Sequence, residues 1–211
     1  MSSSTNLHHV ILNSYKSLDV PIEGEGFLEV YFKSTPTVTS SSSTKTIMDV
    51  IKYGKDISHD ELFDILGKKF EPFEIMRDMP QDSTYHPFSI SRHTYHVYQA
   101  MRDSKYGNDI DMLVASLLHD SGKPICKTFY NYKGDLKRYA SFYNHEKVSA
   151  QMAFDFYKKF PYFDAVKVSI LCQFHMRLHD PNCKKDELKE LIGEEIYDKL
   201  VVLNECDKKG K

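Results

Sequence analysis

Residues 110–124 read IDMLVASLLHDSGKP, an apolar run that leads into a histidine, an aspartate and a helix stop. Apolar side chains stand at positions 110, 113, 114, 117 and 118, a spacing that places them on one face of an α-helix. Gly122 and Pro124 are typical of a helix end. The sequence therefore predicts a buried helix over 109–120, with His119 and Asp120 at its inner end.

The same helical spacing of apolar residues continues on both sides of this segment. Further helices are predicted over 89–101, 144–159, 164–179 and 194–208. Residues 127–143 contain Gly134 and are expected to form a loop or a small hairpin. A succession of amphipathic helices buries its apolar faces most simply by packing together, so the sequence predicts a mainly α fold, a helical bundle.

The first third of the chain has a different pattern. Residues 26–33, GFLEVYFK, are typical of a short strand, and residues 34–46 are rich in serine and threonine and are expected to form a loop. Helices are predicted near 47–53 and from the capping residue Ser58 to about 70. We therefore expect residues 1–78 to form a small N-terminal α+β attachment and residues 79–211 to form the main domain.

Composition narrows the class of protein. The chain has 211 residues and a net charge of -2, and it has no apolar run of roughly 18 residues that could cross a bilayer. The first residues lack the pattern of a secretory signal, so a cytoplasmic protein without membrane contact is expected. The four cysteines form no CxxC pair, which argues against a zinc ribbon or a disulfide framework.

Several polar side chains fall on the faces that should be buried. His93, His145, His175 and Asp207 lie at helical offsets from apolar residues, in addition to the His119-Asp120 pair. A single inward histidine is usually a core residue with a hydrogen-bond partner. Two buried carboxylates, however, must be neutralised by protonation, by cationic partners or by metal, and a nitrogen and oxygen cage suits a divalent transition metal.

The order His93, then His119-Asp120, then Asp207 resembles the HD-domain metal-dependent phosphohydrolases. The resemblance rests on four blocks in sequence, MPQDSTYHPFSISRHTYHV, LLHDSGKP, NHEKVSA and VLNECD. They look like the signature blocks of the branch that includes the HD modules of tRNA nucleotidyltransferases and related RNA-processing enzymes. The resemblance covers about residues 79–209 and implies that residues 79–211 are an HD phosphohydrolase domain.

The resemblance also implies a set of site residues. His93, His119, Asp120 and Asp207 match the basic ligand set, while His145 and His175 match the extra histidines of members that hold two metals, with Asp120 as the bridge. The expected cofactors are divalent ions, two in number, drawn from Mn, Fe, Co, Ni, Mg or Zn. Asp120 and Lys123 are the expected catalytic residues. A metal-activated hydroxide would attack phosphorus, with Lys123 close to a substrate phosphate.

Other positions carry weaker expectations. His86, Arg92 and Arg177 are candidate substrate contacts. A plain loop histidine is an equally good interpretation of His86, and solvated surface arginines are the commoner outcome for Arg92 and Arg177. His96, three residues after His93, is an alternative for the ligand assignment, but the HTxxV register favours His93. The remaining histidines are expected to be exposed: His8, His9, His59 and His179.

Two functions remain open at this point. The first is a phosphomonoesterase or phosphodiesterase acting on nucleotides or RNA-end phosphates, and the alternative is a noncatalytic HD module for RNA binding or nucleotide sensing. Residues 121–160 carry eight Lys or Arg against three Asp or Glu, which suits an anionic substrate. The net negative charge of the whole chain argues against tight nonspecific nucleic-acid binding. The sequence contains no kinase phosphate loop and no nucleotidyltransferase signature, and it does not indicate an oligomeric state.

Overall fold

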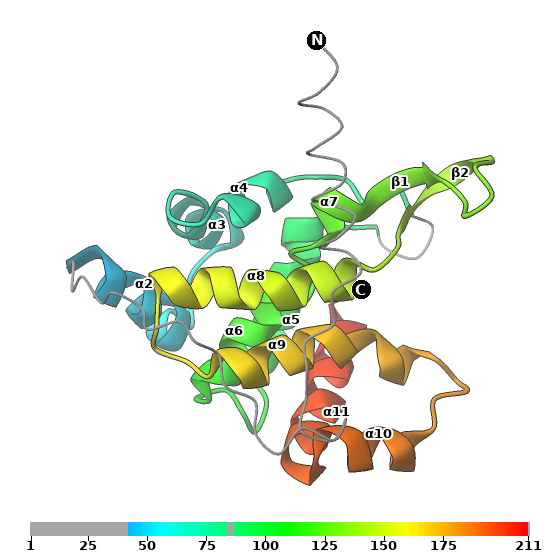
Figure 1. Cartoon of the computed structure of the whole chain (residues 1–211). Coiled ribbons are helices and arrows are strands. Elements are labelled where there is room, and N and C mark those ends of the chain that lie inside the picture. The colour runs from blue at the N-terminus through cyan, green and yellow to red at the C-terminus, as the bar shows by residue number, and fades with distance from the viewer. Residues whose placement is uncertain (1–41, 84–86, 211) are drawn as a thin grey trace.

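The computed structural model describes residues 42–83 and 87–210, with side chains from Ile47 onward. The described chain is mainly helical with one small sheet, as the sequence predicts (Figure 1). The predicted strand at 26–33, the loop residues 34–41 and the side chains of His8, His9 and His86 lie outside the described residues. No helix among the described residues is long and apolar enough to cross a membrane.

Five helices build the bundle: α5 (Ile90–Arg102), α6 (Ile110–Leu118), α8 (His145–Lys159), α9 (Ala165–Phe174) and α11 (Glu194–Lys209). The side chains of Ser89, Asp109 and Asp164 accept hydrogen bonds from the first backbone N–H groups of α5, α6 and α9, which fixes where these helices begin. Helix α8 packs along α9, and α5 packs against α6 and α11 (Figure 1).

The segment after the His-Asp pair forms a short helix and a hairpin. Helix α7 (Lys123–Cys126) leads into β1 (Lys127–Tyr130), which pairs antiparallel with β2 (Leu136–Phe142). Gly134 has a φ of 87°, which glycine adopts without strain, and it lies in the turn between the strands. The hairpin extends away from the bundle (Figure 1), and this settles the alternative between a loop and a hairpin.

The predicted helix over 164–179 is in fact two elements. Helix α9 ends at Phe174, and the chain continues as the 3₁₀ helix η2 (His175–His179). Helix α10 (Lys185–Ile192), which the sequence analysis does not anticipate, follows and packs beside α11. Its apolar face is narrow, because only Leu188 and Ile192 are buried.

The N-terminal helices are α2 (Ser42–Tyr53), α3 (His59–Gly67) and α4 (Glu71–Met76). Helix α2 begins within the predicted Ser/Thr-rich loop, so the prediction was wrong for residues 42–46. The buried apolar face that starts at Ile47 anchors this helix, and a helix extends at little cost once it is nucleated.

The N-terminal helices share the apolar core of the bundle. Phe73 of α4 lies 5.9 Å from Phe156 of α8 between ring centroids, in an edge-to-face arrangement. The hydroxyl of Tyr98 donates a hydrogen bond to the carbonyl of Ile51. The predicted division of the chain at residue 78 stays a prediction.

Candidate metal centre

Six ligand-type side chains from separate elements meet inside the bundle. All six are buried, and they form two groups in which the possible ligand atoms lie within 4.8 Å of one another. The first group is His93, His119 and Asp207, and the second is Asp120, His145 and His175. The convergence predicted for these residues is therefore present in the structure.

The first group joins the start of α5, the end of α6 and the end of α11. The Nε2 atom of His93 lies 3.0 Å from Oδ1 of Asp207 and 3.4 Å from Nε2 of His119. Nε2 of His119 is 4.0 Å from the same Asp207 oxygen. Three donor atoms thus surround one point, although the helices that carry them are far apart in the sequence.

Asp120 connects the two groups through its two carboxylate oxygens. Its Oδ2 lies 3.3 Å from Nε2 of His93 and 3.4 Å from Nε2 of His119. Its Oδ1 lies 3.3 Å from Nε2 of His145 and 3.7 Å from Nε2 of His175. A carboxylate that presents one oxygen to each group is placed as a bridge between two ions.

The four histidines share one orientation. In each ring Nδ1 lies within hydrogen-bond distance of a backbone carbonyl, so an Nδ1–H donates there and Nε2 is left to face the cluster. The carbonyls belong to Gly210 for His93 (3.1 Å), Ser116 for His119 (2.9 Å), Phe142 for His145 (2.7 Å) and Cys172 for His175 (2.7 Å). This is the tautomer in which all four Nε2 atoms can act as metal ligands.

The electrostatics of the cluster favour ionised carboxylates. Burial tends to raise the pKa of the Asp120 carboxyl, but the nearby charge of Lys123 and the histidine contacts hold it well below its usual value. Burial also opposes ionisation of Asp207, yet hydrogen bonds from His179 and His93 lower its pKa. Burial lowers the pKa of His93, but hydrogen bonds to the two aspartates outweigh this effect and raise it from 6.5 to about 9.

Lys123 is the cation of this centre. Its ammonium lies 2.6 Å from Oδ2 of Asp120 and donates a hydrogen bond of 2.8 Å to Oε1 of Gln81. Within the cluster, Asp120 and Asp207 carry two negative charges and Lys123 carries one positive charge. The remaining negative charge is balanced by a proton on His93 or by bound cations.

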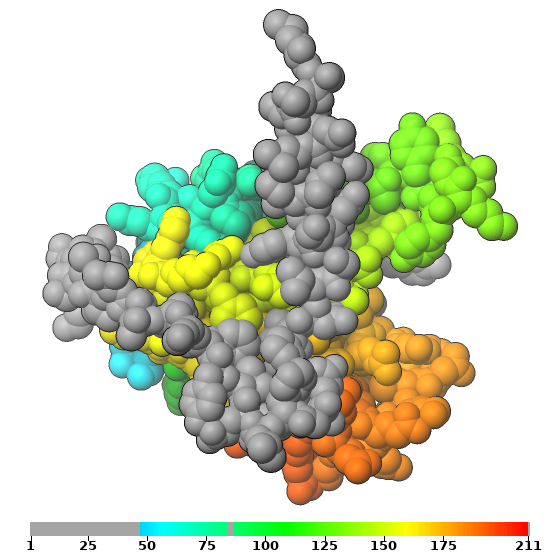
Figure 2. All heavy atoms as spheres, viewed as in Figure 1, coloured from blue at the N-terminus to red at the C-terminus, as the bar shows by residue number. Residues whose placement is uncertain are grey.

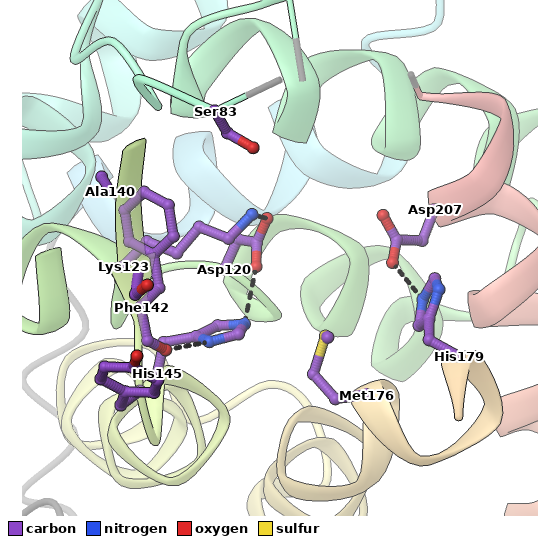
Figure 3. Close-up of a pocket in the computed structure, with 11 residues that line it drawn as sticks. Ser83, Asp120, Lys123, Ala140, Phe142, His145, Met176, His179 and Asp207 are labelled. Carbon is purple, nitrogen blue, oxygen red and sulfur yellow. Dashed lines mark hydrogen bonds and ion pairs between the residues drawn. The ribbon is translucent and has the colours of Figure 1, made fainter. Parts of the chain in front are cut away.

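A pocket of about 600 Å³ opens onto this centre (Figure 3). Lys123, Phe142 and His145 lie on one side of it, His179 and Asp207 lie on the other, and Asp120 lies between them. The full lining is Ser83, Asp120, Lys123, Ala140, Ser141, Phe142, Tyr143, His145, Met176, His179 and Asp207. Pockets of this size accommodate small organic ligands.

The other described residues that the sequence suggested as substrate contacts or as a ligand lie outside the two ligand groups. Arg92 and Arg177 are exposed and are not among the residues that line the pocket. His86 lies outside the described residues, so its predicted role stays a prediction. His96 packs edge-on against Phe88, with ring centroids 4.7 Å apart, and it belongs to neither group, whereas His93 does.

His179 is a residue of the centre that the sequence analysis missed. It was expected to be exposed, but its Nε2 lies 2.7 Å from Oδ2 of Asp207 and its ring lines the pocket. The signal was present as a second histidine four residues after His175. The predicted α-helix over 164–179 would itself have placed His179 on the face of His175, so this spacing could have identified the residue.

The prediction of an exposed His59 was also wrong. This side chain is buried, with Nε2 3.0 Å from the hydroxyl of Ser91 and its ring 5.1 Å from that of Phe63. The contact joins α3 to α5, so it depends on tertiary packing that local sequence does not reveal. His59 supports the fold and lies outside both metal-ligand groups.

The donor set fits divalent metal ions. Imidazole nitrogen and carboxylate oxygen are ligands that Mn, Fe, Co, Ni and Zn accept, and the backbone carbonyls that hold the rings are the usual outer partners of ligating histidines. Two three-residue groups with a shared carboxylate would hold two ions.

Comparison with known protein families finds a match between residues 90–209 and the model described as HD domain. Searches of curated proteins and of solved structures find no match.

Proposed function

This chain belongs to the HD domain family, a family of metal-dependent phosphohydrolases, and on that premise we propose that it hydrolyses phosphoesters of nucleotides or RNA ends. The observation that supports catalysis most directly is the arrangement of six donor side chains in two groups bridged by Asp120. All the ligands needed for a two-ion centre are therefore available, and a pocket gives a substrate access to them.

Two bound divalent ions would lower the pKa of a shared water and offset the charge on attacking and leaving oxygens. The chain's own residues prepare the site for this chemistry. The backbone carbonyls orient the four imidazoles, and Asp120 presents one oxygen to each group. All six donor side chains are buried, and the low local dielectric strengthens the electrostatic interactions among them.

Lys123 is proposed to bind a phosphoryl oxygen. Its ammonium lies at the pocket and is held by Asp120 and Gln81. Cations held by Asp120 would compete for its Oδ2, and this would leave part of the hydrogen-bonding capacity of Lys123 for a substrate. His179 is proposed as a positioning residue, because its contact with Oδ2 of Asp207 leaves Oδ1 directed at His93 and His119.

The substrate class is proposed from the pocket and its surroundings. A pocket of about 600 Å³ suits a nucleotide, and the basic segment 121–160 contributes Lys123 and the uncharged residues 140–143 to its lining. The resemblance to HD modules of RNA-processing enzymes favours 2′,3′-cyclic, 2′- or 3′-phosphate ends of RNA. The fit of the ligand set argues for an enzyme over a noncatalytic HD module.

The test is hydrolysis of aryl phosphate mono- and diesters by the purified protein with manganese, nickel or cobalt, together with the metal content. Asp120→Ala is expected to lower kcat by at least about 1,000-fold, since it removes the shared ligand. The matched control is Asp186→Ala, an exposed aspartate of α10, which should keep wild-type activity. Stoichiometric metal without hydrolysis of any ester would instead identify a noncatalytic module.

Short RNAs that differ only in their ends then identify the substrate. Oligonucleotides ending in a 2′,3′-cyclic phosphate, a 2′-phosphate or a 3′-phosphate are compared by kcat/KM. Free nucleotides with the same ends serve as the reference. If the oligonucleotides show no advantage over the nucleotides, the preference for RNA ends is wrong.

A further inference from the structure

The hairpin of β1 and β2 presents apolar side chains to solvent. Tyr132 is 80% exposed and Leu136 is 73% exposed, and Phe129, Tyr130 and Tyr139 are exposed as well. The hairpin stands out from the rest of the molecule (Figure 2), so these side chains do not cover a core. An exposed group of this kind on a soluble fold indicates a contact surface.

Part of this surface continues into the pocket. The rings of Tyr132 and Tyr143 pack against each other in a tilted arrangement, with centroids 4.0 Å apart and an interplanar angle of 34°. Tyr143 lines the pocket that opens onto Asp120 and Lys123. One face of the hairpin therefore forms an aromatic path from solvent to the candidate metal centre. We call Tyr132, Lys137, Ser141 and Tyr143 the hairpin surface.

The hairpin surface also carries positive charge. The ammonium of Lys137 lies 5.9 Å from the centroid of the Tyr143 ring and donates a hydrogen bond to the hydroxyl of Ser141. Residues 127–143 contain four Lys or Arg and one acidic residue, Asp135. Asp135 accepts a hydrogen bond from Asn131 near the turn. The surroundings of the aromatic path are thus complementary to a polyanion.

We propose that the hairpin surface binds the nucleotides next to the scissile phosphate of a single-stranded RNA, with Tyr132 and Tyr143 stacking on bases and Lys137 contacting the backbone. Stacked aromatic rings beside basic side chains are the usual means of holding single strands without sequence preference. Continuity with a site that is proposed to hydrolyse phosphoesters favours a nucleic-acid strand over a protein or membrane partner. This inference rests on the proposed function and extends it from the reacting end to the adjoining strand.

The first experiment measures binding apart from hydrolysis. The probes are fluorescein-labelled single-stranded RNAs of two and ten nucleotides that end in a 3′ hydroxyl, and fluorescence anisotropy gives Kd for the metal-loaded protein. The ten-nucleotide strand is expected to bind at least about tenfold more tightly than the dinucleotide. Tyr132→Ala should weaken binding of the longer strand by about tenfold. Tyr53→Ala, which removes a tyrosine of similar exposure from α2, should not change its Kd.

A second variant tests the charged part of the surface. Lys137→Ala is expected to weaken binding of the ten-nucleotide RNA and to reduce the dependence of log K on log salt by about 0.7, the value for one contact with a single strand. Lys184→Ala, an exposed lysine beside α10, should leave that slope unchanged. Two results would overturn the proposal. One is that Tyr132→Ala and Tyr53→Ala bind the ten-nucleotide RNA with the same Kd. The other is that the wild-type protein binds the two-nucleotide and ten-nucleotide RNAs with the same Kd.

Kinetics separate this inference from the proposed function. If the enzyme hydrolyses 3′-phosphorylated RNA, Tyr132→Ala should raise KM for the ten-nucleotide substrate, so that the ratio of its kcat/KM to that of an aryl phosphate falls about tenfold. If the wild-type protein hydrolysed no phosphoester, the proposed function would be refuted. The dependence of RNA binding on strand length would still test the hairpin surface, because that measurement does not require hydrolysis. If Tyr132→Ala and Tyr53→Ala had the same ratio of kcat/KM for RNA to kcat/KM for the aryl phosphate, the role of the hairpin surface would be refuted and the proposed function would stand.

Discussion

At the scale of single residues, the spacing of histidines on apolar faces predicted most of the ligand-type side chains that converge. His93, His145 and His175 lie inward because each falls on a helical stripe that packing must bury. Asp207 follows the same rule at the end of α11. What spacing could not predict was the hydrogen-bond partner of each side chain, since the carbonyl of Gly210 meets His93 only through tertiary packing.

Substitution of His179 tests whether this residue positions the metal ligand Asp207. His179→Ala removes the hydrogen bond to Oδ2 of Asp207, so this carboxylate gains rotational freedom. We expect the affinity for the ion of the first group, which includes Asp207, to fall about tenfold, as is typical for partners of metal ligands. Competition with a chromophoric chelator measures this change.

The control for His179 is Met176→Ala, which alters the same pocket without touching a carboxylate. This variant should bind metal as the wild type does. If His179→Ala retained wild-type affinity, the contact with Asp207 would have no role in metal binding.

At the scale of elements, helix starts were predictable where a local side chain caps them. Ser89, Asp109 and Asp164 each accept a hydrogen bond from their own helix, so the sequence contains that information. The change from α9 to η2 and the existence of α10 were not predicted. The start of α2 was placed too late because serine and threonine favour loops only until packing anchors the following residues.

Gly122 sets the separation between the His-Asp segment and α8. A Cβ atom at this position would overlap the carbonyl oxygen of His145 and lie 2.8 Å from Cβ of Val148 and 2.9 Å from the backbone nitrogen of Ser149. Backbone atoms cannot yield as a flexible side chain does. We therefore expect Gly122→Ala to displace the start of α8, to cost about 1–3 kcal/mol of stability and to loosen the ion held by the second group.

The metal content and melting temperature of Gly122→Ala check this expectation. Ser149→Ala is the matched control, because it removes the hydrogen bond from the Gly122 N–H without adding an atom between the segments. It should retain two ions per chain. A Gly122→Ala protein with unchanged metal content would show that α8 tolerates the shift.

At the scale of the whole molecule, the metal centre lies where α5, α6, α8, η2 and α11 meet, so bound ions join elements that are distant in the sequence. Because ligands that bind only the folded state stabilise it, removing the ions should lower the stability of the entire bundle. For each ion present at about 100 Kd the loss is about 2.7 kcal/mol. Differential scanning calorimetry should then show a melting temperature about 5–10 °C lower for each ion that the chelator removes.

The melting temperature of the chelator-treated protein is also expected to depend on pH. In the ion-free protein the pKa of His93 is about 9, above its unfolded value of 6.5, so folding takes up a proton between these pH values. The stabilisation is complete below pH 6.5 and is lost as the pH rises through 9. The melting temperature of the chelator-treated protein should therefore fall between pH 6.5 and 9.5, and His93→Gln should flatten this slope. A slope of the opposite sign would contradict the assignment.

His93 and the carbonyl of Gly210 that receives its Nδ1–H are separated by 117 residues, and Asp207 belongs to the same last turn. During translation at 5–20 residues per second, roughly 6 to 23 seconds pass between the synthesis of these two partners. Throughout that interval the nascent chain displays histidines without the carboxylate that completes their group. The first group is therefore complete only after α11 has emerged from the ribosome, and stable binding of an ion by this group is expected only from that point.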